Sequence, residues 1–294
     1  MSPKCFLCPR NCGIDRAAGE LGFCRCGENP IIARAAAHFG EEPCISGFCG
    51  SGTVFFSGCN MHCVFCQNRE ISFGGKGKEV SVARLAEIFS ELEASGVHNL
   101  NLVTPTHFTD KIIEALKIAK PTIPVVWNSS AYESVETLKT LEGYVQVYMP
   151  DLKYTSAEAA FRFSCARNYP IIAKAAILEM FRQTGSFVMD SEGLLNSGVL
   201  IRHLILPDRL DDAFDVIDWV TESFPKNAVL FSLMSQFLPL ADKFKYPELA
   251  RSLTREEFDR AQSFLSLSAI EHGYFQELSS ATNELIPSFD LTGV

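Results

Sequence analysis

The sequence lacks both an excess of basic residues and long apolar runs. Its 294 residues include 26 Lys and Arg against 35 Asp and Glu, a formal net charge of −9. Gripping a phosphate backbone requires clustered cations, so nucleic acid is not an expected partner. No run approaches the roughly 20 apolar residues that span a bilayer, and the first residues lack an apolar secretory signal. We therefore expect a folded cytoplasmic protein with no membrane partner.

Cysteine is almost absent beyond the first quarter of the chain, because ten of the eleven cysteines lie before residue 67. This distribution excludes a disulfide framework spread through the fold. In a reducing compartment, thiols crowded at one end of a chain more often bind metal or perform redox chemistry. Residues 1–50 also carry only one short apolar run, 31–37, and are too poor in periodic apolar faces to form a core of their own.

From residue 51 onward, short apolar runs alternate with amphipathic segments. We expect strands at 53–56, 99–103, 125–127, 145–149, 199–206 and 229–231, and helices at 82–94, 110–119, 134–141, 156–184 and 211–223. This alternation is typical of parallel β/α units. About six units are fewer than the eight of a closed TIM barrel. The pattern therefore predicts an α/β fold, either a partial (β/α)6 TIM-like barrel or an open sheet, over residues 51–235.

Two further segments flank this predicted barrel. A Cys-rich N-terminal extension, residues 1–50, precedes it, and a C-terminal helical cap, residues 236–294, follows it. The cap includes an amphipathic helix expected at 255–271. In a barrel or an open parallel sheet, ligands bind at the carboxyl ends of the strands. We therefore look for functional residues just after each strand.

The strongest chemical signal follows the first strand of the predicted barrel. Cys59, Cys63 and Cys66 stand at spacings of four and three residues, so one short loop can turn three thiolates inward to an iron–sulfur cluster. A fourth local cysteine is missing. Because structural zinc takes four protein ligands, the three cysteines either use a distant fourth ligand or leave one metal position open to a small chelating molecule.

This loop resembles the C-x3-C-x2-C signature of the radical S-adenosylmethionine (SAM) superfamily. The resemblance implies a [4Fe-4S] cluster on the three cysteines, with the amino and carboxylate groups of SAM on the fourth iron. In that superfamily an electron from the cluster cleaves SAM, and the resulting 5′-deoxyadenosyl radical abstracts hydrogen from a substrate. Phe65, between the last two cysteines, is included among the candidate cofactor contacts.

A closer resemblance covers most of residues 51–240. The chain is similar to the activating enzymes of glycyl radical enzymes, in a branch related to pyruvate formate-lyase activating enzyme. The matching segments are 8–12, 51–59, 104–107, 150–154 and 202–207. The resemblance implies a glycine of a partner glycyl radical enzyme as substrate and a flavodoxin- or ferredoxin-type reductant. Another peptide or a small molecule as substrate, or a non-catalytic electron-transfer protein, remain the alternatives.

The ends of the second and third strands carry polar residues that can contact SAM. Thr104, Thr106 and His107 stand where the activating enzymes have a Gly-Gly-Glu segment that receives the SAM amino group; this chain lacks that segment. Asn128 and Ser129 can bond ribose hydroxyls or the methionyl carboxylate. They stand where the activating enzymes carry an Asp-Thr pair that helps to bind a cation. The alternatives are a simple turn at 104–107 and an ordinary loop at Asn128 and Ser129.

The later strand ends add charged candidates. Asp151 and Lys153 are two residues apart, so an extended backbone places both on one face, and the resemblance implies that both contact SAM. The alternative is a plain surface ion pair. Arg202 lies within an apolar strand, where a charge needs a partner, and is a candidate for the SAM carboxylate or an internal acid. Gln236 is a further candidate contact, whereas His203 is expected in the core.

The extension holds enough thiols for a second metal. Cys5, Cys8, Cys12 and Cys24 form a C-x2-C-x3-C-x11-C pattern that can bind one zinc ion or a second iron–sulfur cluster. Other thiols of the extension can replace any of them, namely Cys26, Cys44 and Cys49. Free thiols are the alternative, because closely spaced cysteines can also remain free in a reducing compartment.

Overall fold

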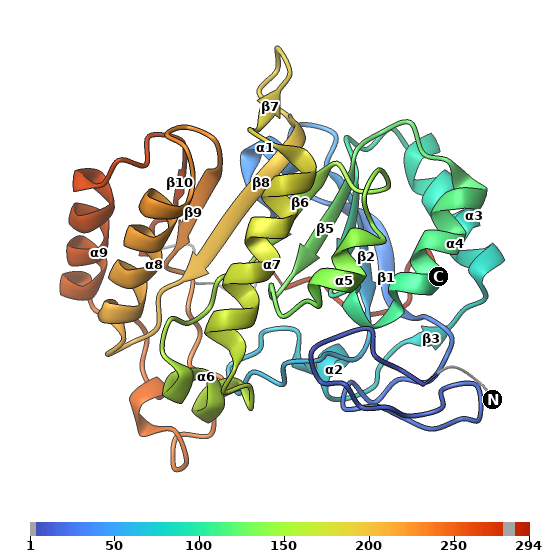
Figure 1. Cartoon of the computed structure of the whole chain (residues 1–294), viewed down its shortest axis with the longest axis horizontal. Helices are drawn as coiled ribbons and strands as arrows, with labels where there is room; N and C mark the ends of the chain where they lie inside the picture. The colour runs from blue at the N-terminus through green and yellow to red at the C-terminus, as the bar shows by residue number, and fades with distance from the viewer. Residues whose placement is uncertain (1–3, 279–285) are drawn as a thin grey trace.

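Figure 1 shows an open sheet flanked by helices. The computed structural model describes residues 4–278 and 286–294. Its strands are β1 (Ile31–His38), β2 (Ser51–Phe56), β3 (Lys78–Glu79), β4 (Leu100–Val103), β5 (Val125–Ser129), β6 (Val147–Pro150), β7 (Val188–Met189), β8 (Leu195–Leu204), β9 (Leu230–Met234) and β10 (Gly273–Phe275). Its α-helices are α1 (Pro43–Ser46), α2 (Arg69–Ser72), α3 (Val82–Ala94), α4 (Thr109–Ala119), α5 (Val135–Lys139), α6 (Ala157–Ser164), α7 (Tyr169–Thr184), α8 (Leu210–Ser223) and α9 (Arg255–Leu267).

The sheet has the strand order β10-β9-β8-β6-β5-β4-β2-β1-β3, with β7 beside β8. Strands β2, β4, β5, β6, β8, β9 and β10 run parallel to one another, so their carboxyl ends meet at one side, whereas β1, β3 and β7 pair antiparallel. No pairing joins β10 to β3 in the described ranges, so the sheet is not closed. This agrees with the predicted partial TIM-like barrel of fewer than eight units. The sheet also extends beyond residues 51–235, because β1 pairs with β2 and β10 with β9.

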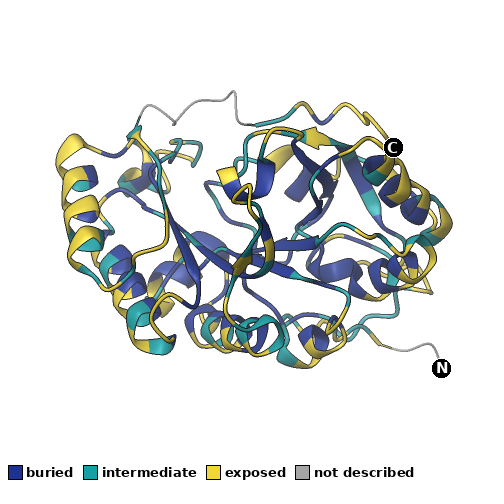
Figure 2. Ribbon diagram, turned by 90° about the horizontal axis from the view of Figure 1, so that it is seen from above, coloured by how far each residue is buried: buried dark blue, intermediate teal, exposed yellow. Residues whose placement is uncertain are grey.

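The helices cover the sheet with their apolar sides, and Figure 2 shows their exposed sides turned outward. In α3, Leu85, Ile88, Phe89 and Leu92 are buried, which is the spacing of one helix face. The Ser81 side chain caps this helix by accepting from the Arg84 N–H at 3.1 Å. No helix in 4–278 or 286–294 is both long enough and apolar enough to cross a bilayer.

The helical stretch expected at 156–184 is present but divided into two separate helices, α6 and α7. Cys165 ends α6 in the left-handed conformation, with φ of 53°. Pro170 lies in the first turn of α7. Its missing N–H is tolerated there, but it would break a continuous helix that ran through residue 170. The break leaves the last carbonyl groups of α6 without helical partners, and that of Ser164 accepts a hydrogen bond from Arg10 beside the functional site.

The extension contacts both ends of the barrel. At the amino ends of the strands, Cys44 and Ile45 of α1 pack against Val126, Met149 and Leu200 and fill the barrel interior. At the carboxyl ends, the part of the extension that precedes β1 lies beside α2 (Figure 1), while β1 itself is part of the sheet. The end of the chain returns to β1, where the Leu291 N–H donates to the Ala33 carbonyl at 3.0 Å.

Candidate functional site

The cysteine loop begins where β2 ends, with a sharp turn at Gly58. Gly58 has φ of 81°, and a Cβ there would collide with the Cys26 sulfur and lie 2.6 Å from the Cys24 carbonyl oxygen. Only glycine fits both the conformation and the space. The loop is therefore packed directly against the N-terminal extension.

Each of the three cysteine sulfurs in this loop accepts a hydrogen bond. The Met61 N–H donates to Cys59 Sγ at 3.4 Å, the Ser164 hydroxyl to Cys63 Sγ at 2.9 Å, and the Ser72 hydroxyl to Cys66 Sγ at 3.3 Å. Donors placed on sulfur stabilise the thiolate form and tune a bound cluster. The loop thus provides three sulfurs with oriented donors around them.

Burial makes these thiols hard to ionise without a cation. It raises the pKa of Cys59 to about 12 and that of Cys63 to about 11, and it also raises the pKa of Cys66. The nearby sulfurs of Cys63 and Cys66 increase the shift at Cys59. Metal ions bind the thiolate form, so this trio favours a ligand that brings positive charge.

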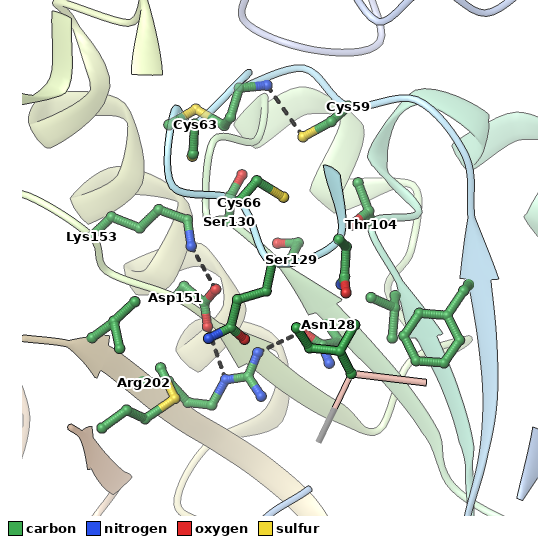
Figure 3. A pocket seen from close by; sticks show the side chains of 18 of the residues that line it. Cys59, Cys63, Cys66, Thr104, Asn128, Ser129, Ser130, Asp151, Lys153 and Arg202 are labelled. Atoms are coloured by element: carbon green, nitrogen blue, oxygen red, sulfur yellow. Dashed lines mark hydrogen bonds and ion pairs between the residues drawn. The ribbon is translucent and has the colours of Figure 1, made fainter. Parts of the chain in front are cut away.

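The three cysteines line one cavity of about 230 Å³ together with the polar strand ends. Figure 3 shows the cysteines at one end of this pocket and Arg202 at the other, with Lys153 and Asp151 between them. In a cubic cluster each thiolate binds its own iron, whereas structural zinc takes four protein ligands. Three cysteines that border a pocket thus suit a cluster with one open iron better than a single zinc ion.

A charged network faces these cysteines across the pocket. Lys153 Nζ lies 2.7 Å from Asp151 Oδ2, and Arg202 Nε lies 2.8 Å from Asp151 Oδ1. The side chains of Asp151 and Lys153 are 19% and 17% exposed, which is too buried for an ordinary surface pair. Burial alone would raise the pKa of Asp151, but Arg202 and Lys153 hold it below its ordinary value.

Arg202 binds internal acids, one of the two roles predicted for it. Besides Asp151, its guanidinium donates to Glu41 Oε2 at 2.9 Å and to Asn128 Oδ1 at 2.8 Å. Each of its three nitrogens therefore donates to a protein group. Lys153 has one carboxylate partner and three N–H groups, so it can also donate to a ligand carboxylate.

The remaining strand ends bring most of the predicted contacts to the same pocket. Its lining includes Phe65, Thr104, Thr106, Asn128, Ser129 and Gln236. The Thr106 hydroxyl already donates to Glu133 Oε1 at 2.7 Å, whereas Gln236 Oε1 is buried without a partner. Thr104 has φ of 59°, which is strained for a β-branched residue. Such strain tends to cluster at functional sites.

The structure does not bring His107 to this pocket. Its ring is buried beneath the cysteine loop, where Nε2 bonds the Ser57 carbonyl at 2.8 Å, and it borders a separate cavity beside the extension. A helical turn starts at Thr106, and it directs the side chains of Thr106 and His107 to different cavities. His203 lies in the core, where Nδ1 bonds the Leu152 carbonyl at 2.7 Å.

A second metal is not supported at Cys5, Cys8, Cys12 and Cys24. These thiols form no ion-binding group in the described part of the chain. Instead, Cys24 Sγ accepts from Arg16 Nη2 at 3.4 Å, and the Cys26 thiol donates to the Ser57 carbonyl at 3.3 Å. Cys26 thus helps to join the extension to the end of β2, whereas Cys24 bonds within the extension.

Sequence reasoning missed two residues of the extension that shape the site. Arg10 donates to the carbonyls of Asn60 and Cys165 at 2.7 and 2.6 Å, so it ties the cysteine loop to the end of α6. It lies within the 8–12 segment that carried the resemblance, which was the available signal. Glu41 contacts Arg202 at the pocket floor, and nothing in its local sequence indicates this contact.

Comparison with known proteins identifies the family. Residues 53–220, which are 168 of the 294, match the model of the Radical SAM superfamily, so the chain belongs to this superfamily. Membership implies an enzyme that uses a [4Fe-4S] cluster and SAM. A Methanocaldococcus jannaschii protein described as "Uncharacterized protein MJ0674" is 32% identical over 268 residues, which cover 88% of this chain and 73% of the relative.

Solved structures of SuiB from Streptococcus suis are also similar to this chain. The structure bound to the precursor peptide SuiA has a TM-score of 0.49 and 12% identity, over 78% of this chain and 49% of SuiB. The structure bound to SAM has a TM-score of 0.49 and 15% identity, over 79% of this chain and 51% of SuiB. The chain thus spans about half the length of SuiB.

Proposed function

We propose that this chain holds a [4Fe-4S] cluster on Cys59, Cys63 and Cys66 and binds SAM across the neighbouring strand ends. The observation that carries the proposal is that the three sulfurs and the Asp151–Lys153 pair line one pocket. When bound, the cluster would supply the electron that cleaves SAM to a 5′-deoxyadenosyl radical, which abstracts hydrogen. The protein's own task is to orient SAM and exclude water.

The polar groups of the pocket suit the two charges of the methionyl end of SAM. Lys153 can donate to its carboxylate, and Asp151 can accept from its ammonium group, because both side chains border the cavity. Asn128 and Ser129 extend the polar lining at the end of β5. An electron carrier that binds no second molecule needs no such pocket, so the geometry favours catalysis over simple electron transfer.

The first test is release of 5′-deoxyadenosine after anaerobic reconstitution with iron and sulfide, followed by dithionite and SAM. We expect release from the wild type and none from Cys63→Ser. Cys49→Ser is the matched control, because Cys49 is exposed and outside the loop, and it should retain release. An intact cluster with no deoxyadenosine from the wild type would instead support the electron carrier.

For the substrate, we propose a glycine of a partner glycyl radical enzyme, on the strength of the sequence resemblance. A flavodoxin or ferredoxin would supply the electron in the cell. Another peptide or a small molecule is the second candidate, because the pocket alone does not select among hydrogen donors. A candidate partner with deuterated glycine decides between them: deuterium in the released deoxyadenosine supports the glycine, and none from an accepted partner refutes it.

A further inference from the structure

The floor of the pocket is built in part by Glu41, a residue outside the 53–220 segment that matches the family. Glu41 lies between β1 and α1, and its side chain is 10% exposed. Its Oε1 accepts from Asn101 Nδ2 at 3.0 Å and from Asn128 Nδ2 at 3.2 Å, and its Oε2 accepts from Arg202 Nη1 at 2.9 Å. One carboxylate thus ties together β4, β5 and β8.

The position of Glu41 is enforced by the segment that follows it. Pro43 starts α1, and Ile45 is fully buried in the barrel interior. The Glu41 N–H also donates to Ser46 Oγ at 3.1 Å, and Asn99 Nδ2 donates to the Ile45 carbonyl at 2.7 Å. Because α1 is anchored in this way, the carboxylate is presented to the pocket rather than to solvent.

The hydrogen bonds around Arg202 depend on this carboxylate. Two cations, Arg202 and Lys153, face three acids, Asp151, Glu41 and Glu42. Glu42 lies 3.6 Å from Arg202 and adds negative charge there. Glu41, not Glu42, makes the hydrogen bonds to Arg202, Asn101 and Asn128. Without Glu41, each of these three side chains would lose a hydrogen bond that Glu42 does not supply.

We propose that Glu41 is a positioning residue for SAM. It fixes Arg202 and Asn128 at the pocket floor, which leaves the Asp151–Lys153 pair free to meet the charges of the methionyl group. This inference rests on the proposed function and adds to it that the N-terminal extension is part of the SAM site. Removing one partner of a buried ionic hydrogen-bond network is costly because the others are left unpaired.

The contact between Glu41 and Asn128 allows a reciprocal exchange as the test. Glu41→Gln removes the charge, and Asn128→Asp alone would bring two carboxylates into a contact that is now 3.2 Å. In the double variant the amide donates in the opposite direction, and Arg202 again has a second carboxylate. We expect each single change to weaken SAM binding on the order of tenfold, and the double variant to recover most of this loss.

SAM binding is measured on the reconstituted enzyme by equilibrium dialysis and by the SAM-dependent change in the EPR spectrum of the reduced cluster. Iron and sulfide content should stay unchanged in all variants. Glu136→Gln is the control, because Glu136 is exposed and pairs with Lys139 on the surface; it should bind SAM like the wild type.

Two results overturn the role of Glu41 alone: wild-type affinity in Glu41→Gln, or a double variant that binds as weakly as the single ones. A merely structural role would look different, because lost folding stability would lower the iron and sulfide content of the single variants together with their SAM binding. Failure of the proposed function looks different. The wild type itself would then show neither a SAM-dependent EPR change nor deoxyadenosine, and both proposals would be overturned.

Discussion

Arg10 offers a sharp test of whether the N-terminal extension holds the cysteine loop in place. Its guanidinium donates to the carbonyls of Asn60, Cys165 and Ser164 at 2.7, 2.6 and 3.2 Å and stacks on the Phe23 ring at 3.8 Å. A hydrogen bond to a charged group contributes about 1.5–3 kcal/mol. Because water can replace part of this bonding, we expect Arg10→Met to lower the free energy of unfolding by about 2–4 kcal/mol.

Arg84 provides the matched control, because it also makes several hydrogen bonds. Its carboxylate partners are Glu87 and Glu91, whose side chains are 64% and 58% exposed. Exposed ion pairs contribute about 0.2–1 kcal/mol, so Arg84→Met should cost much less than Arg10→Met. The difference in partners, backbone carbonyls of the site against solvated carboxylates, is what the comparison isolates.

The assay has two parts. Urea unfolding of the cluster-free protein under anaerobic, reducing conditions gives the free energy of unfolding, and a chelator challenge of the reconstituted protein gives the rate of iron loss. We expect Arg10→Met to lose iron faster, because the loop carrying the three thiols is released from α6. Equal unfolding free energies in the two variants, or equal rates of iron loss, would refute the reasoning.

Three further changes probe other parts of the site. Gly58→Ala should reduce the iron bound on reconstitution because its Cβ has no room, whereas Gly143→Ala, at a similar φ of 85° but in open space, should not. Ser164→Ala removes the hydroxyl that donates to Cys63, so we expect a lower midpoint potential in an EPR-monitored redox titration; an unchanged or higher value would contradict this. Because the pKa of Asp151 is held below its ordinary 3.8, its carboxylate stabilises the fold above about pH 4, and this contribution is lost on acidification. Asp151→Asn should therefore show a smaller drop in unfolding free energy between pH 6 and pH 3, measured by circular dichroism; a drop as large as that of the wild type would argue against the effect.

Local pattern was enough to predict the partial barrel, and most of the predicted site residues line the candidate pocket. Helix 82–94 appears with those bounds as α3, because its capping serine and its apolar spacing are both local features. The cysteine loop and the strand-end residues Asp151 and Lys153 were found for a related reason. In a parallel sheet, segments that are remote in sequence meet at the carboxyl ends of the strands. Knowing the fold class therefore predicts which ends converge.

Tertiary structure alone decided how the extension joins this site. Glu41 and Arg202 are 161 residues apart, and Arg10 and Cys165 are 155 apart, so no periodicity links either pair. Likewise, Thr106 reaches the pocket while His107 is turned beneath the loop, which depends on the turn that the chain takes after β4. Spacing determines which side chains can share a face, but the packing of α1 and of the Cys-rich segment against the barrel determines which charges meet. That packing is set by burial and complementary shape over the whole molecule, which local sequence does not record.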